Sequence, residues 1–174
     1  MFDIAHMLTE AGACDALIGW AYMLPDGTTP QQAWDRCSRP EWLLWWAGRH
    51  AGPVGSYGRR RFALACCEVT RTVLHMVPDE DDCARIAVET VEAWARGDAW
   101  APTLEDARRA ASATDNIAGV CGANATNAAI CATNAVGSSP ATASHVASYA
   151  LCAGADPKTL DAIIRRHYPE VPHV

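Results

Sequence analysis

The sequence has no long hydrophobic run and no leader pattern. Its longest apolar stretch, from Trp42 to Gly48, is far shorter than the roughly 20 residues that a membrane-spanning helix needs. The N-terminus lacks the basic segment followed by an apolar one that is typical of a secretory signal. We therefore expect a cytoplasmic protein that does not engage a membrane.

A surplus of positive charge is also missing. The 174 residues include 14 Lys and Arg against 20 Asp and Glu, which gives a net charge of -6, and Lys158 is the single lysine. Contacts with phosphates need a concentrated cationic surface, so this balance argues against direct nucleic-acid binding. The negative net charge instead favours a basic protein as the partner.

The sequence contains none of the spacings that hold metals, nucleotides or catalytic nucleophiles. Cys-x-x-Cys, His-x-x-x-His and EF-hand patterns do not occur. The glycine-rich stretch from Gly52 to Gly58 lacks both the P-loop lysine and a preceding strand. We therefore expect no cofactor and no enzymatic activity.

Eight cysteines without a signal peptide predict reduced thiols rather than a disulfide framework. We interpret them chiefly as small buried apolar residues. The alternative is a catalytic thiol, which would be Cys66, Cys67 or Cys152 activated by His75 or His145, and none of these lies in a recognisable motif.

Helix start and stop signals recur along the chain, whereas no alternating run of Val, Ile and Thr indicates a strand. Capping boxes are predicted at Thr29 with Gln32 and at Ser38 with Glu41. We predict an all-α protein, a single compact domain over 1–174 with six to eight helices and a loose tail at 169–174. Expected helices begin near positions 3, 30, 39, 59, 82, 103, 140 and 157, and the first is interrupted near Gly12.

The two halves of the sequence differ in side-chain size. The segment from Trp42 to Trp46 is apolar on nearly every helical face, which indicates burial on several sides or an interface. From Ala101 to Ala155, 18 of the 55 residues are alanine, so helices in this C-terminal half must pack closely. The predicted core comprises Trp42, Trp45, Phe62, Val69, Val73, Val91 and Trp94.

Two charged clusters have alternative interpretations. The acidic run Asp79, Glu80, Asp81 and Asp82 precedes a helix, where carboxylates can cap free amides at the positive end of the helix dipole. Four consecutive carboxylates exceed what one cap requires, so the run is also a candidate recognition patch. The basic triplet at 59–61 opens another helix and is interpreted as a solvated cluster in preference to a recognition feature.

Asparagines recur in the alanine-rich half. Asn116, Asn124, Asn127 and Asn134 fall within a narrow arc if their segment is one helix. Buried amides of this kind can fix the register of close-packed helices, and an exposed row can hydrogen-bond a ligand or partner. We keep Asn124, Asn127 and Asn134 as candidate binding residues.

Several stretches, taken in order, resemble an all-helical family of bacterial immunity proteins from polymorphic toxin systems, which has relatives in phage and prophage genomes. The stretches are Cys14–Leu17, Gln32–Asp35, Trp42–Trp45, Ala87–Trp94 with Gly97, Thr103–Arg108 and His145–Leu151. The resemblance implies an all-α fold and a protein partner, and it implies no catalytic residues. His145 is a further candidate binding residue, and Tyr149 stands where the family pattern has a second histidine.

The expected function is therefore that of a non-enzymatic binding protein, an immunity protein that neutralises a cognate toxin by direct binding. The alternative is a phage-encoded inhibitor of a host defence system. Such an inhibitor would act by protein binding, by nucleic-acid mimicry or by sequestering a small ligand. Genome context and a retained small ligand would distinguish the two hypotheses.

Overall fold

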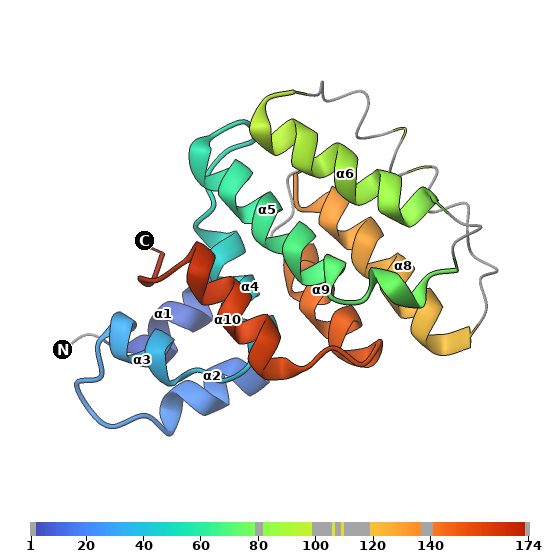
Figure 1. The fold of residues 1–174 in the computed structure, drawn as a ribbon. Helices are drawn as coiled ribbons and strands as arrows, with labels where there is room; N and C mark the ends of the chain where they lie inside the picture. The colour runs from blue at the N-terminus through green and yellow to red at the C-terminus, as the bar shows by residue number, and fades with distance from the viewer. Residues whose placement is uncertain are drawn as a thin grey trace.

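The computed structural model describes residues 3–78, 82–98, 106, 109, 119–136 and 141–172, apart from the side chains of 119 and 141–144. Over these residues the chain forms nine α-helices and one 3-10 helix, with no strand (Figure 1). The elements are α1 (Ile4–Glu10), α2 (Asp15–Tyr22), α3 (Pro30–Arg36), α4 (Pro40–Arg49), α5 (Tyr57–Arg71), η1 (Leu74–Met76), α6 (Cys83–Arg96), α8 (Gly119–Asn134), α9 (Ala141–Cys152) and α10 (Pro157–His167). The all-α prediction is confirmed.

More helices form than the six to eight predicted. The first expected helix is two helices, α1 and α2, because Gly12 adopts a left-handed conformation with φ of 75° that an α-helix cannot contain. The helix expected to begin near position 59 begins at Tyr57 and ends at Arg71, after which the chain continues into η1.

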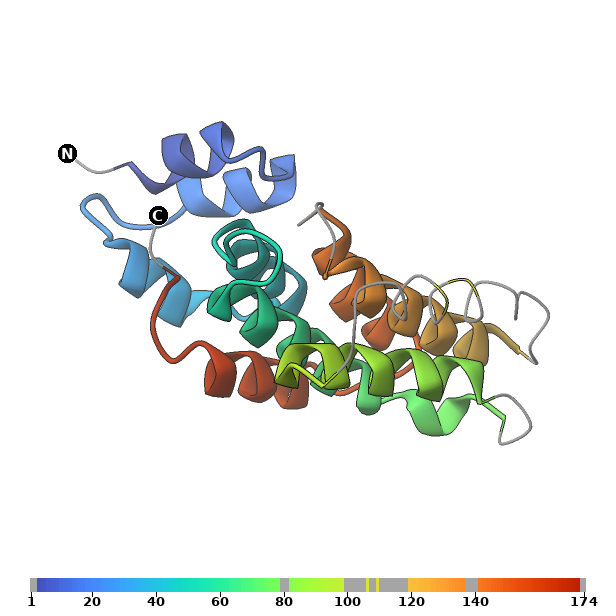
Figure 2. The ribbon, with the colours of Figure 1, turned by 90° about the horizontal axis from the view of Figure 1, so that it is seen from above.

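Helix α5 lies at the centre of the fold and contacts α4, α6, α8, α9 and α10 (Figures 1 and 2). Helices α8 and α9 pack together, and α4 packs against α9. Helices α1 and α2 form a pair at one end of the molecule, and α6 lies on the side away from them (Figure 2).

Nearly all buried apolar side chains join one core. Phe62, Val69, Val73 and Val91 are at most 1% exposed, as predicted. Trp42 and Trp94 are buried too. Trp45 is half-buried, so its assignment to the core is wrong in part. Trp45 also lines a pocket.

The basic triplet is not a solvated cluster. The Arg59 side chain is buried, and its Nε and Nη2 atoms donate to the Gly52 carbonyl at 3.0 and 2.7 Å. Its Nη1 atom donates to the carbonyl of Ala135, at the end of α8, at 3.2 Å. The Arg61 guanidinium lies 4.8 Å from the ring centre of Tyr168. These contacts fix the loop before α5, the end of α8 and the C-terminal segment around one helix.

Helix caps agree with the sequence in most places. The Thr29 box forms completely, and Asp156 accepts a hydrogen bond from the Thr159 amide at 2.9 Å at the start of α10. Helix α6 ends at Gly97, whose φ is 93°. The Ser38 box does not form, since the N-cap of α4 is Arg39, which makes no side-chain cap.

The tail is held to the fold as far as Pro172, contrary to the predicted loose end. Val171 is buried, and its amide donates to the side-chain oxygen of Gln31 at 2.8 Å. Positions 173 and 174 lie outside the described residues. None of the helices in the described part of the chain is long and apolar enough to cross a membrane.

Candidate functional site

The predicted binding residues that the structure describes lie in three separate places. Asp79, Glu80 and Asp81 fall outside the described residues, and so does Asn116. Asp82 precedes α6, the three remaining asparagines lie on α8, and His145 lies on α9. The structure therefore does not join the acidic run, the asparagine row and His145 into one site through the residues it describes.

Asp82 is the N-cap of α6, but its side chain makes no cap hydrogen bond. Its backbone is helical, with φ of -75° and ψ of -9°, rather than extended as side-chain capping requires. The carboxylate instead pairs with Arg85 one turn along the helix, and both side chains are largely exposed. The prediction that the Asp82 side chain caps α6 is thus wrong. Its role in recognising a partner stays a prediction.

Asn124, Asn127 and Asn134 share one face of α8, as their spacing predicted. All three are half-buried, at the border between the core side of the helix and its outer side. Their neighbours Ala125, Ala128 and Ala132 are completely buried. The three asparagines are thus neither fully buried between helices nor fully exposed to a partner. That they fix the register of the helices, or that they bind a ligand or partner, both stay predictions.

His145 lines a pocket of about 270 Å³ that three parts of the chain enclose. We call it the Trp45 pocket. Its lining consists of Gly12, Cys14, Leu17, Glu41, Trp42, Trp45 and His145. The first three come from the turn between α1 and α2 and from α2, the next three from α4, and the last from α9.

Local sequence explains how α4 contributes to this pocket. Pro40 at the first helical position starts α4, so that Glu41 and Trp45 lie one turn apart on the same face. Leu43, Leu44 and Trp46 are at most 1% exposed and anchor the other faces of the helix. The half-buried Trp45 ring is therefore held on a rigid element.

Aromatic and charged groups contact the residues that line the pocket. The Arg39 guanidinium lies 4.5 Å from the Trp42 ring centre, and its Nε donates to Oε1 of Glu41 at 2.7 Å. The Trp20 ring lies 5.8 Å from that of Trp42. On α9, the rings of His145 and Tyr149 meet edge to face at 6.3 Å between centres. The result is a half-exposed surface rich in the side chains that dominate protein interfaces.

Two of the three thiols considered as nucleophiles, those of Cys66 and Cys67, are not activated by their surroundings. Cys66 and Cys67 are completely buried, and this burial raises the pKa of both thiols, which keeps them protonated. Cys152 is exposed at the end of α9. Across the described part of the chain, no three His, Cys, Asp or Glu side chains are placed to hold a metal ion.

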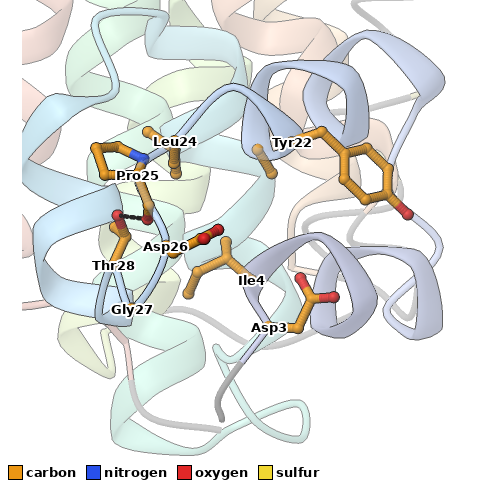
Figure 3. A pocket seen from close by; sticks show the side chains of 9 residues that line it. Asp3, Ile4, Tyr22, Leu24, Pro25, Asp26, Gly27 and Thr28 are labelled. Carbon is orange, nitrogen blue, oxygen red and sulfur yellow. Dashed lines mark hydrogen bonds between the residues drawn. The ribbon is translucent and has the colours of Figure 1, made fainter.

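A second pocket, of about 380 Å³, lies between α1 and the end of α2 (Figure 3). It contains no residue predicted from the sequence. Its two carboxylates are those of Asp3 and Asp26, and Asp3 already caps α1 by accepting from the amides of Ala5 and His6. The Tyr22 ring is 70% exposed and points away from Pro25 (Figure 3). Among the described residues that line this pocket, Tyr22 is the only aromatic one and none is Lys, Arg or His.

Cys14, Glu41 and Trp45 were not predicted as site residues. The sequence held one signal for Trp45, since its segment is apolar all round and such a helix is either buried on every side or in part an interface. Cys14 and Glu41 could not be found in this way, because they line one pocket only where the turn before α2, helix α4 and His145 of α9 come together.

Comparison of the chain with protein-family models, with curated proteins and with solved structures finds no match in any of the three.

Proposed function

We propose that this protein is a non-enzymatic immunity protein that neutralises a toxin by binding it, with the Trp45 pocket at the centre of the contact surface. The observation that carries the proposal is the half-buried Trp45 beside Trp42 and His145. Tryptophan, tyrosine and arginine supply most of the residues that dominate binding energies at protein interfaces. Arg39 and Tyr149 add the other two kinds at the same place.

The rigidity of the surface supports the same proposal. Helix α4 is fixed by side chains buried on its other faces, and its Trp34–Trp46 contact, with ring planes at 87°, joins it to α3. A tryptophan presented on such an element loses little conformational freedom when a partner covers it. Binding energy is then not spent on ordering the surface.

The charge of the chain supports a basic partner. With a net charge of -6, the protein attracts a cationic surface at long range, which raises the association rate at low salt. Neutralisation by coverage needs no catalytic group in this protein.

Co-expression with the products of neighbouring genes tests the proposal. We expect one of them to be toxic alone, harmless together with this protein, and bound to it in size-exclusion chromatography. Trp45→Ala should weaken that complex by at least about 30-fold, which corresponds to about 2 kcal/mol for a central aromatic contact. Circular dichroism and thermal unfolding show whether the variant folds.

Tyr57→Ala is the matched control, because Tyr57 is 81% exposed and lines a different pocket. Its complex should keep the affinity of the unaltered protein. Failure of every neighbouring product to bind would overturn the proposed function, and a folded Trp45→Ala variant with unchanged affinity would exclude the Trp45 pocket from the contact.

A further inference from the structure

We infer that the Trp45 pocket accepts an arginine side chain, whose guanidinium stacks on tryptophan and pairs with Glu41. The inference rests on the proposed function for the identity of the partner as a basic protein. The chemistry of the pocket itself is argued from its lining and can be tested without any partner.

The charge of the lining favours a cation. Among the described residues that line the pocket, Glu41 is the only carboxylate and none is arginine or lysine. The Glu41 side chain is only 13% exposed, so its carboxylate lies in surroundings poorer in water than an ordinary surface group. An unlike charge that enters such surroundings is attracted more strongly than it would be in open solvent.

Glu41 also has room for a second donor. Arg39 donates to Oε1 through both Nε and Nη2. No donor to Oε2 is found among the described residues. Arg39 is not part of the pocket lining, and its own side chain is 55% exposed. The unused oxygen can therefore serve a guanidinium that comes from the pocket side.

The chain already shows the proposed mode of contact next to the pocket. Arg39 combines a ring contact at 4.5 Å to Trp42 with hydrogen bonds to the Glu41 carboxylate. A planar guanidinium suits this combination, because it stacks on a ring and donates within its own plane, whereas an ammonium has no planar face to stack. Arg61 on Tyr168 and Arg165 near Trp34 repeat the ring contact elsewhere in the fold.

The apolar lining of the pocket also matches an arginine side chain. The Trp42 and Trp45 rings and Leu17 give apolar surface for the aliphatic stem of an arginine, and the carboxylate lies beside them for its head. The pocket volume of about 270 Å³ leaves space for one side chain and not for a large ligand. A partner would thus insert one arginine here as an anchor.

Nα-acetyl-arginine amide is the probe, and Nα-acetyl-citrulline amide is its uncharged counterpart of nearly the same shape. Each is titrated into the unaltered protein labelled with nitrogen-15, and the indole N–H signals of Trp42 and Trp45 are followed by NMR after assignment with Trp→Phe variants. We expect saturable shifts with arginine amide, with a dissociation constant on the order of a few millimolar for so small a ligand. Citrulline amide should bind at least about 10-fold more weakly, since it cannot supply the charge.

Glu41→Gln removes the charge from the pocket and should abolish the preference for arginine over citrulline. Glu10→Gln is the matched control, because Glu10 is an exposed carboxylate on α1 outside the lining, and this variant should keep the preference. Equal binding of the two amides by the unaltered protein would overturn the inference, and this comparison needs no variant to fold. A folded Glu41→Gln protein that still prefers arginine would overturn it as well.

These titrations separate the inference from the proposed function. A toxin that is neutralised while arginine amide leaves the Trp45 signal unchanged would remove only the arginine anchor. Selective arginine binding without any neutralised neighbour would remove only the immunity role.

Discussion

The two halves of the molecule reach a buried core by different physical means. Around α3, α4 and α5, a few large side chains, among them Trp34, Trp46 and Phe62, each remove much apolar area from water. In α8 and α9 the buried residues are mostly alanine, and cohesion depends on how closely the helix backbones approach. The first region stabilises the fold through large residues, and the second through the fit of small ones.

The difference in side-chain size between the two regions also affects which of them can bind a partner. A helix that carries three tryptophans can bury two of them and leave a third half-exposed, and α4 does this with Trp42, Trp46 and Trp45. A helix of small residues offers a partner little apolar area. The aromatic region therefore provides both the core and the candidate binding surface.

Truncation in the aromatic region gives the largest expected effect. Trp34 is completely buried, and Trp34→Ala should lower the free energy of unfolding by about 3 to 5 kcal/mol, because a large cavity replaces the ring. Trp45→Ala on the neighbouring helix should cause a smaller loss, since the Trp45 ring is less completely buried than that of Trp34. Urea unfolding measures both variants, and equal losses would contradict the distinction between the two tryptophans.

The next largest effect is expected where the two halves meet. Arg59 of α5 donates to the carbonyls of Gly52 and of Ala135 at the end of α8. Arg59→Met keeps most of the length but leaves these acceptors without its hydrogen bonds, which should cost about 2 to 3 kcal/mol in urea unfolding. Arg49→Met, at an exposed position of α4, serves as the control and should change the stability little. A loss no larger than that of the control would show that Arg59 does not link the halves energetically.

Enlarging a side chain tests the small-residue region. Ala128 is completely buried in α8, and its carbonyl lies 3.4 Å from the Thr70 hydroxyl of α5. Ala128→Leu should lower the free energy of unfolding by about 1 to 3 kcal/mol through overpacking. Ala123→Leu places the same side chain on the exposed face of the same helix and should be nearly neutral. Thermal unfolding compares the two, and a tolerated leucine at 128 would mean that α8 is not closely packed there.

The same contrast explains which parts of the fold could be predicted. Helices with a strong apolar stripe, such as α5 with Phe62 and Val69, could be located from spacing alone. Helix α8 gives little such signal, because alanine, threonine and cysteine are found both inside and outside, and its buried face depends on α5, α6 and α9. The burial of Arg59 was missed for a related reason, since its partners at 52 and 135 come from other segments.

The candidate site could be predicted only in part. His145 was named from a resemblance, and the apolar run from Trp42 to Trp46 suggested burial or an interface without choosing between its members. Which tryptophan stays partly exposed depends on other parts of the chain, because Trp42 packs on Trp20 of α2 and Trp46 on Trp34 of α3. His145 of α9, which lines the pocket with Trp45, lies 100 residues later in the chain. No pattern within α4 contains that information.

The smallest expected effect concerns the two predicted capping boxes. In each of them, the position of a proline decides at which residue the helix begins. Pro30 directly follows Thr29, so the helix begins at Pro30 and the Thr29 hydroxyl accepts from the Gln32 amide at 3.2 Å. At the second site Pro40 lies two residues after Ser38 and forces Arg39 into an extended conformation, with φ of -105° and ψ of 105°. The helix can then begin only at Pro40, which leaves Ser38 one position too early to cap it.

Thr29→Ala should therefore lower the free energy of unfolding by about 1 kcal/mol, the usual loss for a working cap. Ser38→Ala should change it by less than about 0.5 kcal/mol, since an exposed serine that caps nothing is removed. Both residues are exposed, and both substitutions exchange a small hydroxyl side chain for a methyl group, so each variant is the control for the other in the same urea titration. Equal losses would mean that Ser38 caps α4 in solution and that the proline does not set the start of the helix.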